Sequence, residues 1–317
     1  MSNQRLALVV FHTRREDALH AALETIHALI ARGMSAVVQP DDLVELKSFA
    51  TRHDKISWLD SAQPLQTGQS AGASVDELEV AIVLGGDGTI LKAAELVREG
   101  QTPIVGINLG HVGFLAESER EELAEAVHRV VERDYTITEL LTIDVSVQVE
   151  GNEVYRSWAL NEATVEKNAR ERMLEVVVEV DGRPLSSFGC DGIVMSTPTG
   201  STAYAFSAGG PVVWPSVEAL LLVPLSAHAL FARPLVVNPH SVLAVEVLKR
   251  SAGVGVLWCD GRRSTELPLG ARVEVSRSAK SVRLARLRSG PFTDRLVQKF
   301  ALPVDGWRGP AHEAGQA

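Results

Sequence analysis

The chain has 317 residues, enough for about two domains of ordinary size, each with its own hydrophobic core. Its 31 Lys and Arg residues against 40 Asp and Glu residues give a net charge of −9, which argues against binding to the phosphate backbone of nucleic acids. Hydrophobic residues make up 45% and charged residues 22% of the chain, a composition that excludes a mainly disordered protein.

The N-terminal sequence, MSNQRLALVVFHTRRED, lacks the basic start, long apolar centre and small-residue cleavage site of a secretory signal. The most apolar stretch, residues 219–232, is interrupted by polar residues and a proline and falls short of the ~20 apolar residues that a membrane span requires. Only Cys190 and Cys259 are present, too few for a disulfide framework. We therefore expect a cytoplasmic protein with no membrane segment.

The first residues predict an α/β arrangement. The apolar run Leu6 to Phe11 predicts a strand, and apolar residues at helical spacing up to Gly33 predict a helix after it. Ala36 to Val38 is a second strand candidate, so the opening fits a β-α-β unit. Residues 61–74 are mostly small or polar, which favours a mobile surface loop.

A clearer unit follows. Val80 to Leu84 predicts a buried strand, the run GGDGT at residues 85–89 predicts a turn, and Ile90 to Arg98 predicts a helix. Ile104 to Ile107 predicts the next strand. This alternation indicates a Rossmann-like α/β domain.

After Tyr135 the pattern becomes typical of antiparallel β-structure. Apolar and polar residues alternate at 143–149 and 176–180, and Asp181-Gly182 predicts a hairpin turn because glycine readily adopts positive φ. Similar runs follow up to Val275. We therefore predict three regions: an α/β domain at 1–135, a β-rich and largely antiparallel domain at 136–280, and a C-terminal segment at 281–317 that packs back on the first domain, with a short helix at 292–300 and a frayed tail.

The run GGDGT is the strongest chemical signal. Three glycines let the backbone approach a ligand closely, and the start of the following helix offers free N–H groups and a partial positive charge, so phosphate is a suitable guest. The loop is neither a Walker loop nor a dinucleotide G-x-G-x-x-G, because no Gly-Lys-Ser/Thr follows and Leu91 replaces the last glycine. Asp87 could accept a hydroxyl proton, position a metal, or cap the helix.

Two further segments are candidates for polar binding. STPTGSTAY at 196–204 offers hydroxyl groups and backbone amides; its alternative interpretation is a connection in which Ser201 or Thr202 caps a helix. Asn161-Glu162 combines an amide and a carboxylate at a predicted strand end, which can grip a ribose diol or an amide-bearing base. The alternative for that pair is a surface turn.

These segments together resemble the NAD kinase family: GGDGT, GFL at 113–115, Asn161-Glu162, and Asp191-Gly192 followed by TPTGSTAY, in this order. Phosphofructokinase-type, diacylglycerol and sphingosine kinases have loops similar to GGDGT, so the TPTGSTAY run is what distinguishes this family. The resemblance extends from about Val80 to the end, and AHALFARP and FTDRLVQKF look most like actinobacterial members.

The resemblance implies an enzyme that transfers a phosphoryl group from ATP or inorganic polyphosphate to the 2′-hydroxyl of the adenosine ribose of NAD, giving NADP. It implies Mg²⁺ or another divalent cation and a homodimer or homotetramer. Two alternatives stay open: a lipid or sugar kinase that shares only the glycine loop, and a dinucleotide-binding regulator without catalysis.

The resemblance also implies roles for matching residues. Asp87 is the implied catalytic residue, which orients or deprotonates the ribose hydroxyl, and no metal ligand is assigned. The implied nucleotide-binding residues are Gly85, Gly86, Gly88 and Thr89 at phosphate oxygens, Phe114 at the adenine, Asn161 and Glu162 on the dinucleotide, Asp191 near the nicotinamide, Thr199, Thr202, Ala203, Tyr204 and Ser207 around the adenine and ribose, and Asp260 at the same site.

Overall fold

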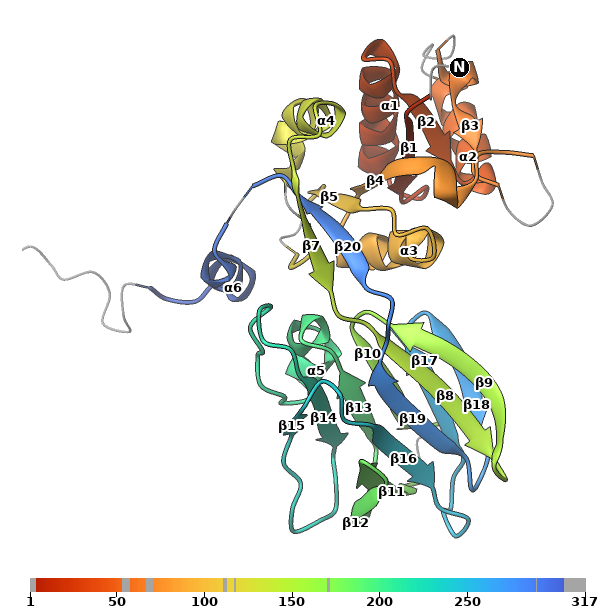
Figure 1. Cartoon of the computed structure of the whole chain (residues 1–317), viewed down its shortest axis with the longest axis vertical. Helices are drawn as coiled ribbons and strands as arrows, with labels where there is room; N and C mark the ends of the chain where they lie inside the picture. Colours follow the sequence, from red (N-terminus) through yellow and green to blue (C-terminus); the bar gives the residue numbers. More distant parts are fainter. Residues whose placement is uncertain are drawn as a thin grey trace, which may run out of the picture. The chain divides into compact units, whose positions relative to one another are not determined.

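The computed structural model describes residues 4–52, 58–66, 71–110, 113–116, 118–169, 172–288 and 290–304. The chain divides into two compact units, one formed by Met1–Thr138 with Arg283–Ala317 and the other by Glu139–Val282. The chain leaves the first unit along strand β7 (Thr136–Leu140) and returns along β20 (Val282–Arg286), and these two strands are neighbours in one sheet (Figure 1).

The first unit is built on an eight-stranded sheet in the order β3-β2-β1-β4-β5-β20-β7, with β6 beside β5. Its central strands pair in parallel. The other elements of this unit are β1 (Leu6–Phe11), α1 (Glu16–Ala31), β2 (Ser35–Val38), α2 (Pro40–Thr51), β3 (Gln63–Pro64), β4 (Leu78–Leu84), α3 (Asp87–Val97), β5 (Ile104–Asn108), β6 (Ser118–Glu119), α4 (Leu123–Val131) and α6 (Phe292–Phe300), with single 3-10 turns at Leu59–Ser61, Val75–Glu77 and Arg120–Glu122.

Helices bury both faces of this sheet. Alternate residues such as Val9 and Ile82 share one apolar cluster with α1, α2 and α4. On the opposite face, a Cβ at Gly106 of β5 would meet the Ile90 side chain of α3 at 2.6 Å, which shows how closely that helix packs. Burial on two faces explains why β1 and β4 are apolar almost throughout.

The second unit is a pair of six-stranded antiparallel sheets, ordered β15-β14-β13-β10-β17-β18 and β12-β11-β16-β19-β8-β9. Inward-facing residues of both sheets, among them Val145, Val176, Ile193 and Leu257, form one core. The elements are β8 (Ile143–Val149), β9 (Asn152–Ala159), β10 (Glu162–Lys167), β11 (Leu174–Val180), β12 (Arg183–Cys190), β13 (Gly192–Ser196), η4 (Thr199–Thr202), α5 (Tyr204–Ser207), β14 (Leu220–Leu225), β15 (Leu235–Val237), β16 (Leu243–Val247), β17 (Gly255–Cys259), β18 (Arg263–Leu267) and β19 (Arg272–Arg277).

The predicted α/β domain with a β-α-β opening and the predicted antiparallel β-structure are confirmed. The prediction of a mobile loop at 61–74 is wrong for much of that segment, whose residues 67–70 lie outside the described ones. Leu65 and Ala73 are buried, and Gln63–Pro64 pairs with β2. Pairing there uses backbone groups, which the small and polar side chains did not reveal.

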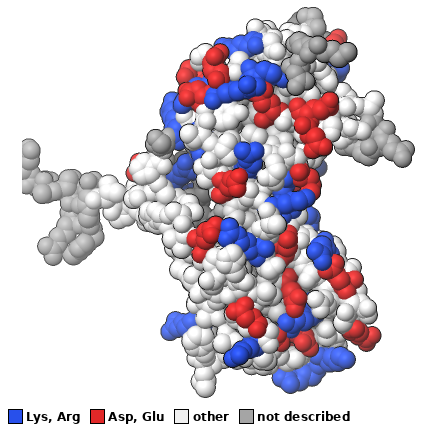
Figure 2. All heavy atoms as spheres, viewed as in Figure 1, with Lys and Arg blue, Asp and Glu red and all other residues white. Residues whose placement is uncertain are grey.

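Acidic and basic side chains are interspersed on the face shown in Figure 2. Within the described ranges, no helix has both the length and the apolar character needed to cross a membrane.

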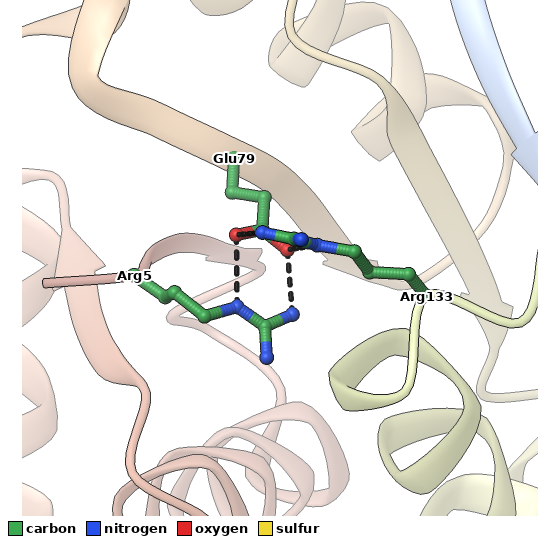
Figure 3. A network of polar contacts seen from close by, with 3 residues as sticks. All are labelled: Arg5, Glu79 and Arg133. Atoms are coloured by element: carbon green, nitrogen blue, oxygen red, sulfur yellow. Dashed lines mark hydrogen bonds and ion pairs between the residues drawn. The ribbon is translucent and has the colours of Figure 1, made fainter. Parts of the chain in front are cut away.

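A polar network joins three segments of the first unit (Figure 3). The Glu79 carboxylate on β4 accepts hydrogen bonds from Arg5 at 2.9 and 2.6 Å and from Arg133 at 2.9 and 2.8 Å. Hydrogen bonds from these two guanidinium groups lower the pKa of Glu79 to about 2. The carboxylate therefore stays ionised in the folded protein over nearly the whole pH range.

We expect Glu79→Gln to lower the free energy of unfolding at pH 7 by about 1–2 kcal/mol, because charge-assisted hydrogen bonds are lost at a partly exposed site. Since the folded pKa lies below the ordinary value of 4.5, this stabilisation is present above pH 4.5 and disappears as pH falls toward about 2. Urea unfolding at pH 7 and pH 3, with exposed Glu45→Gln as control, measures it. A difference between wild type and Glu79→Gln that grows on acidification would contradict the account.

Candidate active site

The glycine turn connects β4 to α3 in the first unit. Gly85 has φ +153°, and a Cβ there would lie 2.5 Å from the Thr89 hydroxyl oxygen, so a larger residue does not fit. By contrast, a Cβ on Gly86 or Gly88 would have no neighbour within 4 Å among the residues that the structure describes. The turn is thus tight on its inner side and open on its outer side, as a loop that receives a ligand must be.

Asp87 is the first residue of α3, but it does not cap the helix. Gly86 is at the N-cap, without a side-chain cap. Instead, the Asp87 carboxylate accepts hydrogen bonds from the backbone N–H groups of Phe114 (to Oδ2, 3.1 Å) and Leu115 (to Oδ1, 3.0 Å). Each carboxylate oxygen keeps a second acceptor site, so the group is oriented and can still bind a hydroxyl.

Phe114 lies between this carboxylate and the C-terminal helix. The residue is 8% exposed, and its ring packs against Phe292 and Phe300 of α6, with centroid distances of 5.9 and 5.8 Å. The Phe114 carbonyl accepts a hydrogen bond from Arg295 of the same helix. Residues 111 and 112, just before this segment, lie outside the described part of the chain.

In the second unit, strand pairing brings three of the candidate binding segments together. Strand β10 lies between β13 and β17 and is antiparallel to both. Its first residue, Glu162, pairs with Ser196 at the end of β13, and Ala163 pairs with Cys259 at the end of β17. Asn161-Glu162, the TPTG segment and Asp260 therefore meet at one end of the sheet.

The surface-turn interpretation of Asn161-Glu162 is wrong, because these residues are only 8% and 7% exposed. The TPTG segment lies over them. The Ser196 hydroxyl donates to the Asn161 carbonyl (3.1 Å), and a Cβ on Gly200 would clash with that same carbonyl oxygen. Glycine is therefore required at position 200, because the backbone there lies against the Asn161 carbonyl oxygen.

The helix-capping interpretation of Ser201 and Thr202 is also wrong. The N-cap of η4 is Pro198, and that of α5 is Ala203, with no side-chain cap at either. The Ser201 hydroxyl accepts from the Val213 N–H (2.9 Å) and donates to the Pro198 carbonyl, closing the loop on itself. Of the other loop residues with an implied binding role, Thr199, Thr202 and Ala203 are half-buried, and Tyr204 and Ser207 are exposed.

Asp260 organises the Asn161-Glu162 turn. Its carboxylate accepts hydrogen bonds from the backbone N–H groups of Leu160 (3.0 Å), Asn161 (2.7 Å) and Glu162 (3.4 Å). It also accepts one from the Arg263 guanidinium (2.8 Å). Asp260 itself has φ +53° and a side chain that is 2% exposed. Burial raises its pKa, and these donors oppose the rise.

A cavity of about 460 Å³ opens beside this turn, with Glu162 and Asp260 in its wall. Glu162 Oε2 is buried and has no hydrogen-bond partner among the described residues. Burial, and secondly the charge of Asp260, raise the pKa of Glu162 to about 8. The remaining lining residues are Thr164, Glu166, Tyr204, Trp258 and Gly261.

Thr164, Glu166 and Trp258 were not predicted. The signal for two of them was present in the sequence, since Glu162, Thr164 and Glu166 alternate along one strand and so share a face. Only Glu162, the first residue of this strand, was predicted to be functional, so Thr164 and Glu166 were overlooked.

Asp191 lies apart from the Glu162 end of β10. It precedes β13 and forms an ion pair with Lys167, the last residue of β10, at 2.5 Å. Five residues of strand correspond to about 17 Å, so the two ends of β10 are well separated. Lys167 and Ser226 lower the pKa of Asp191, and Asp191, with Glu166 and Glu162, adds to the effect of burial in raising the pKa of Tyr204.

We expect Glu162→Gln to stabilise the protein at pH 8. Between pH 4.5 and about 8 the folded protein retains a proton on Glu162 that the unfolded chain releases, so stability falls as pH rises through this window. The substitution removes this cost and should raise Tm at pH 8 by about 2–4 °C, a shift typical of ~1 kcal/mol. Calorimetry at pH 4.5 and pH 8 measures the effect; a gain that is equal at both pH values would show that ionisation is not its cause.

Both units match models of one protein family. Residues 7–135 match the ATP-NAD kinase N-terminal domain, and residues 160–287 match the ATP-NAD kinase C-terminal domain. An NAD kinase of Leifsonia xyli is 61% identical over 313 residues, covering 98% of this chain and 99% of that protein. An NAD kinase of Thermobifida fusca is 54% identical over 316 residues, 98% of this chain and 94% of that protein.

Solved structures share the fold. Yeast NADH kinase complexed with NADH covers 94% of this chain and 87% of its own, with a TM-score of 0.79 at 21% identity. The match to an NAD kinase from Archaeoglobus fulgidus in complex with ATP covers 94% of this chain and 99% of that one, with a TM-score of 0.66 at 23% identity.

Proposed function

This chain belongs to the NAD kinase family and is a phosphotransferase that acts on NAD, and we propose that Asp87 is its catalytic residue and ATP its phosphoryl donor. The observation that carries the proposal is the Asp87 carboxylate, which two backbone N–H groups orient directly after an open glycine turn. With both domain models matched, a lipid or sugar kinase that shares only the glycine turn has no support.

In the proposed step, the 2′-oxygen of the adenosine ribose attacks the γ-phosphorus of ATP. The bond from that phosphorus to the β,γ-bridging oxygen breaks, and ADP leaves with the electron pair. Asp87 orients the ribose hydroxyl and accepts its proton. Because phosphoryl transfer passes through a loose transition state, alignment of the hydroxyl is the main contribution of such a carboxylate.

The glycine turn and the start of α3 supply backbone N–H groups to phosphate oxygens in this proposal, with Gly85, Gly86, Gly88 and Thr89 around them. A divalent cation such as Mg²⁺ would neutralise charge on the donor phosphates. Across the part of the chain that the structure describes, no three His, Cys, Asp or Glu side chains form a group that could hold a metal. In enzymes of this kind Mg²⁺ commonly keeps several waters and binds substrate phosphates, and no protein ligand is assigned to it here.

In the second unit, we propose that Asn161 and Glu162 bind the dinucleotide, with the unpartnered Glu162 Oε2 accepting or donating at a ribose hydroxyl. Phe114 would lie near the adenine and Asp191 near the nicotinamide. The remaining proposed contacts are those of Thr199, Thr202, Ala203, Tyr204, Ser207 and Asp260. Asp260 would act indirectly, by holding the Asn161-Glu162 turn in place.

We further propose that the protein is a cytoplasmic homodimer or homotetramer and that inorganic polyphosphate is a second donor. The structure of yeast NADH kinase contains NADH, so we propose NADH as a second acceptor to include in assays of this chain.

The test is NADP formation by the purified protein with NAD and Mg²⁺, comparing ATP, polyphosphate and no donor. We expect NADP with ATP. Product with polyphosphate alone would refute ATP as the donor, and NAD binding without any product would favour the non-catalytic regulator.

A further inference from the structure

Helix α6 carries an apolar stripe with one prominent partner. Phe292, Leu296 and Phe300 recur at four-residue spacing and share a face of the helix, while none of its residues is fully buried. Two of the three rings at this contact belong to the stripe, and the third is that of Phe114. The helix is therefore attached to the first unit beside the segment that touches Asp87.

Arg295 of α6 adds a directed polar contact. Its Nη1 donates a hydrogen bond to the Phe114 carbonyl oxygen at 2.9 Å. That carbonyl belongs to the same planar peptide group as the Leu115 N–H, which donates to Asp87 Oδ1 at 3.0 Å. One rigid peptide plane thus links the guanidinium on one side to the carboxylate on the other.

This geometry has two physical consequences. Because the peptide group is planar, fixing its oxygen also fixes the direction of its N–H. A cationic donor at the oxygen also polarises the amide, so that the N–H becomes a stronger donor to the carboxylate, as in other hydrogen-bonded chains. Both effects act on the orientation of Asp87 through the intervening 114–115 peptide group.

We propose that α6 is a positioning element for the catalytic centre and that Arg295 is a positioning residue, acting on Asp87 through the 114–115 peptide. The inference rests on the proposed role of Asp87. It assigns a task in the reaction to the C-terminal helix, which begins at Phe292, far beyond the glycine turn at residues 85–89 in the sequence.

The test uses Arg295→Ala in the full chain, with Arg288→Ala as the matched control. Arg288 pairs with Glu122 at 2.6 Å and is 54% exposed, and it lies in the same C-terminal segment. For Arg295→Ala we expect kcat to fall about 10-fold to 100-fold with KM for NAD within about twofold of wild type, since misalignment of a reacting group costs rate rather than binding. Added guanidinium at millimolar concentration should restore part of the rate.

Phe300→Leu, which keeps an apolar contact with Phe114, is the second variant and should lower kcat less than Arg295→Ala. Three results would overturn the inference: kcat of Arg295→Ala equal to that of Arg288→Ala, a rise in KM for NAD that matches the fall in kcat, or a loss of rate that follows a lowered Tm and does not respond to guanidinium. An active Asp87→Asn variant would instead refute the proposed function itself, so the two failures are distinguishable.

Discussion

Asp87→Asn should lower kcat by about 10²-fold to 10⁴-fold, the range associated with general acid-base groups. Two physical effects combine. An amide cannot accept the proton of the ribose hydroxyl, and its NH₂ group must face one of the two N–H groups, from Phe114 or Leu115, that the carboxylate now accepts. KM for NAD should change far less, because the proposed dinucleotide contacts of Asn161 and Glu162 are untouched.

Steady-state kinetics and calorimetric titration of NAD measure the two quantities separately. The matched control is Asp60→Asn, which neutralises a 71% exposed aspartate of the same unit that pairs with Lys47. Turnover of Asp87→Asn within a few-fold of Asp60→Asn would show that Asp87 is not the catalytic residue.

Gly113→Ala should also reduce turnover strongly, by about 10-fold to 100-fold, since small displacements of a reacting group carry costs of this order. A Cβ at position 113 would clash with Asp87 Oδ1 and lie 2.9 Å from Asp87 Cγ. The carboxylate must then move away from the Phe114 and Leu115 N–H groups that orient it.

Gly110→Ala is the matched control, because among the described residues its Cβ would meet only Arg15 Nη2, at 3.7 Å. Comparing kcat and Tm of the two variants separates misalignment of Asp87 from a general effect of adding a methyl group to this segment. If Gly113→Ala retains the kcat of Gly110→Ala, the close packing of Gly113 against Asp87 has no catalytic importance.

Local features of the fold could be predicted where the sequence itself carried the periodicity. The strand at Val80 to Leu84 is buried on both faces and so is apolar throughout, and the helix at Phe292 to Phe300 shows its apolar spacing plainly. Helix α2, by contrast, was missed although the sequence carries its signals: Pro40 at the first helical position and Asp41 and Asp42 in the first turn favour a helix start. Its buried residues, Leu43, Leu46, Phe49 and Ala50, recur at helical spacing and pack with α1 in one apolar cluster.

The candidate site shows a similar division. GGDGT and Asn161-Glu162 could be singled out because their residue types are unusual between a strand and a helix or after an apolar strand. Their local interpretations as a helix cap and a surface turn failed because the partners come from distant segments: Phe114 and Leu115 for Asp87, and Asp260 for Asn161-Glu162.

The contact between Arg295 and the Phe114 carbonyl could not be predicted from the sequence at all. Its partner, Phe114, is 181 residues away, and nothing in FTDRLVQKF distinguishes this arginine from one that faces solvent. Only the folded arrangement brings the guanidinium to the peptide group that contacts Asp87. Long-range contacts to backbone groups of this kind leave no local pattern in a sequence.

The most direct test of the account is the position of the phosphate that the wild-type enzyme adds to NAD. Incubation with NAD, ATP and Mg²⁺, followed by ³¹P NMR of the purified product, should reveal one new phosphomonoester, on the 2′-oxygen of the adenosine ribose. A phosphate on another hydroxyl group, or recovery of unchanged NAD from a protein that binds it, would contradict the proposed reaction.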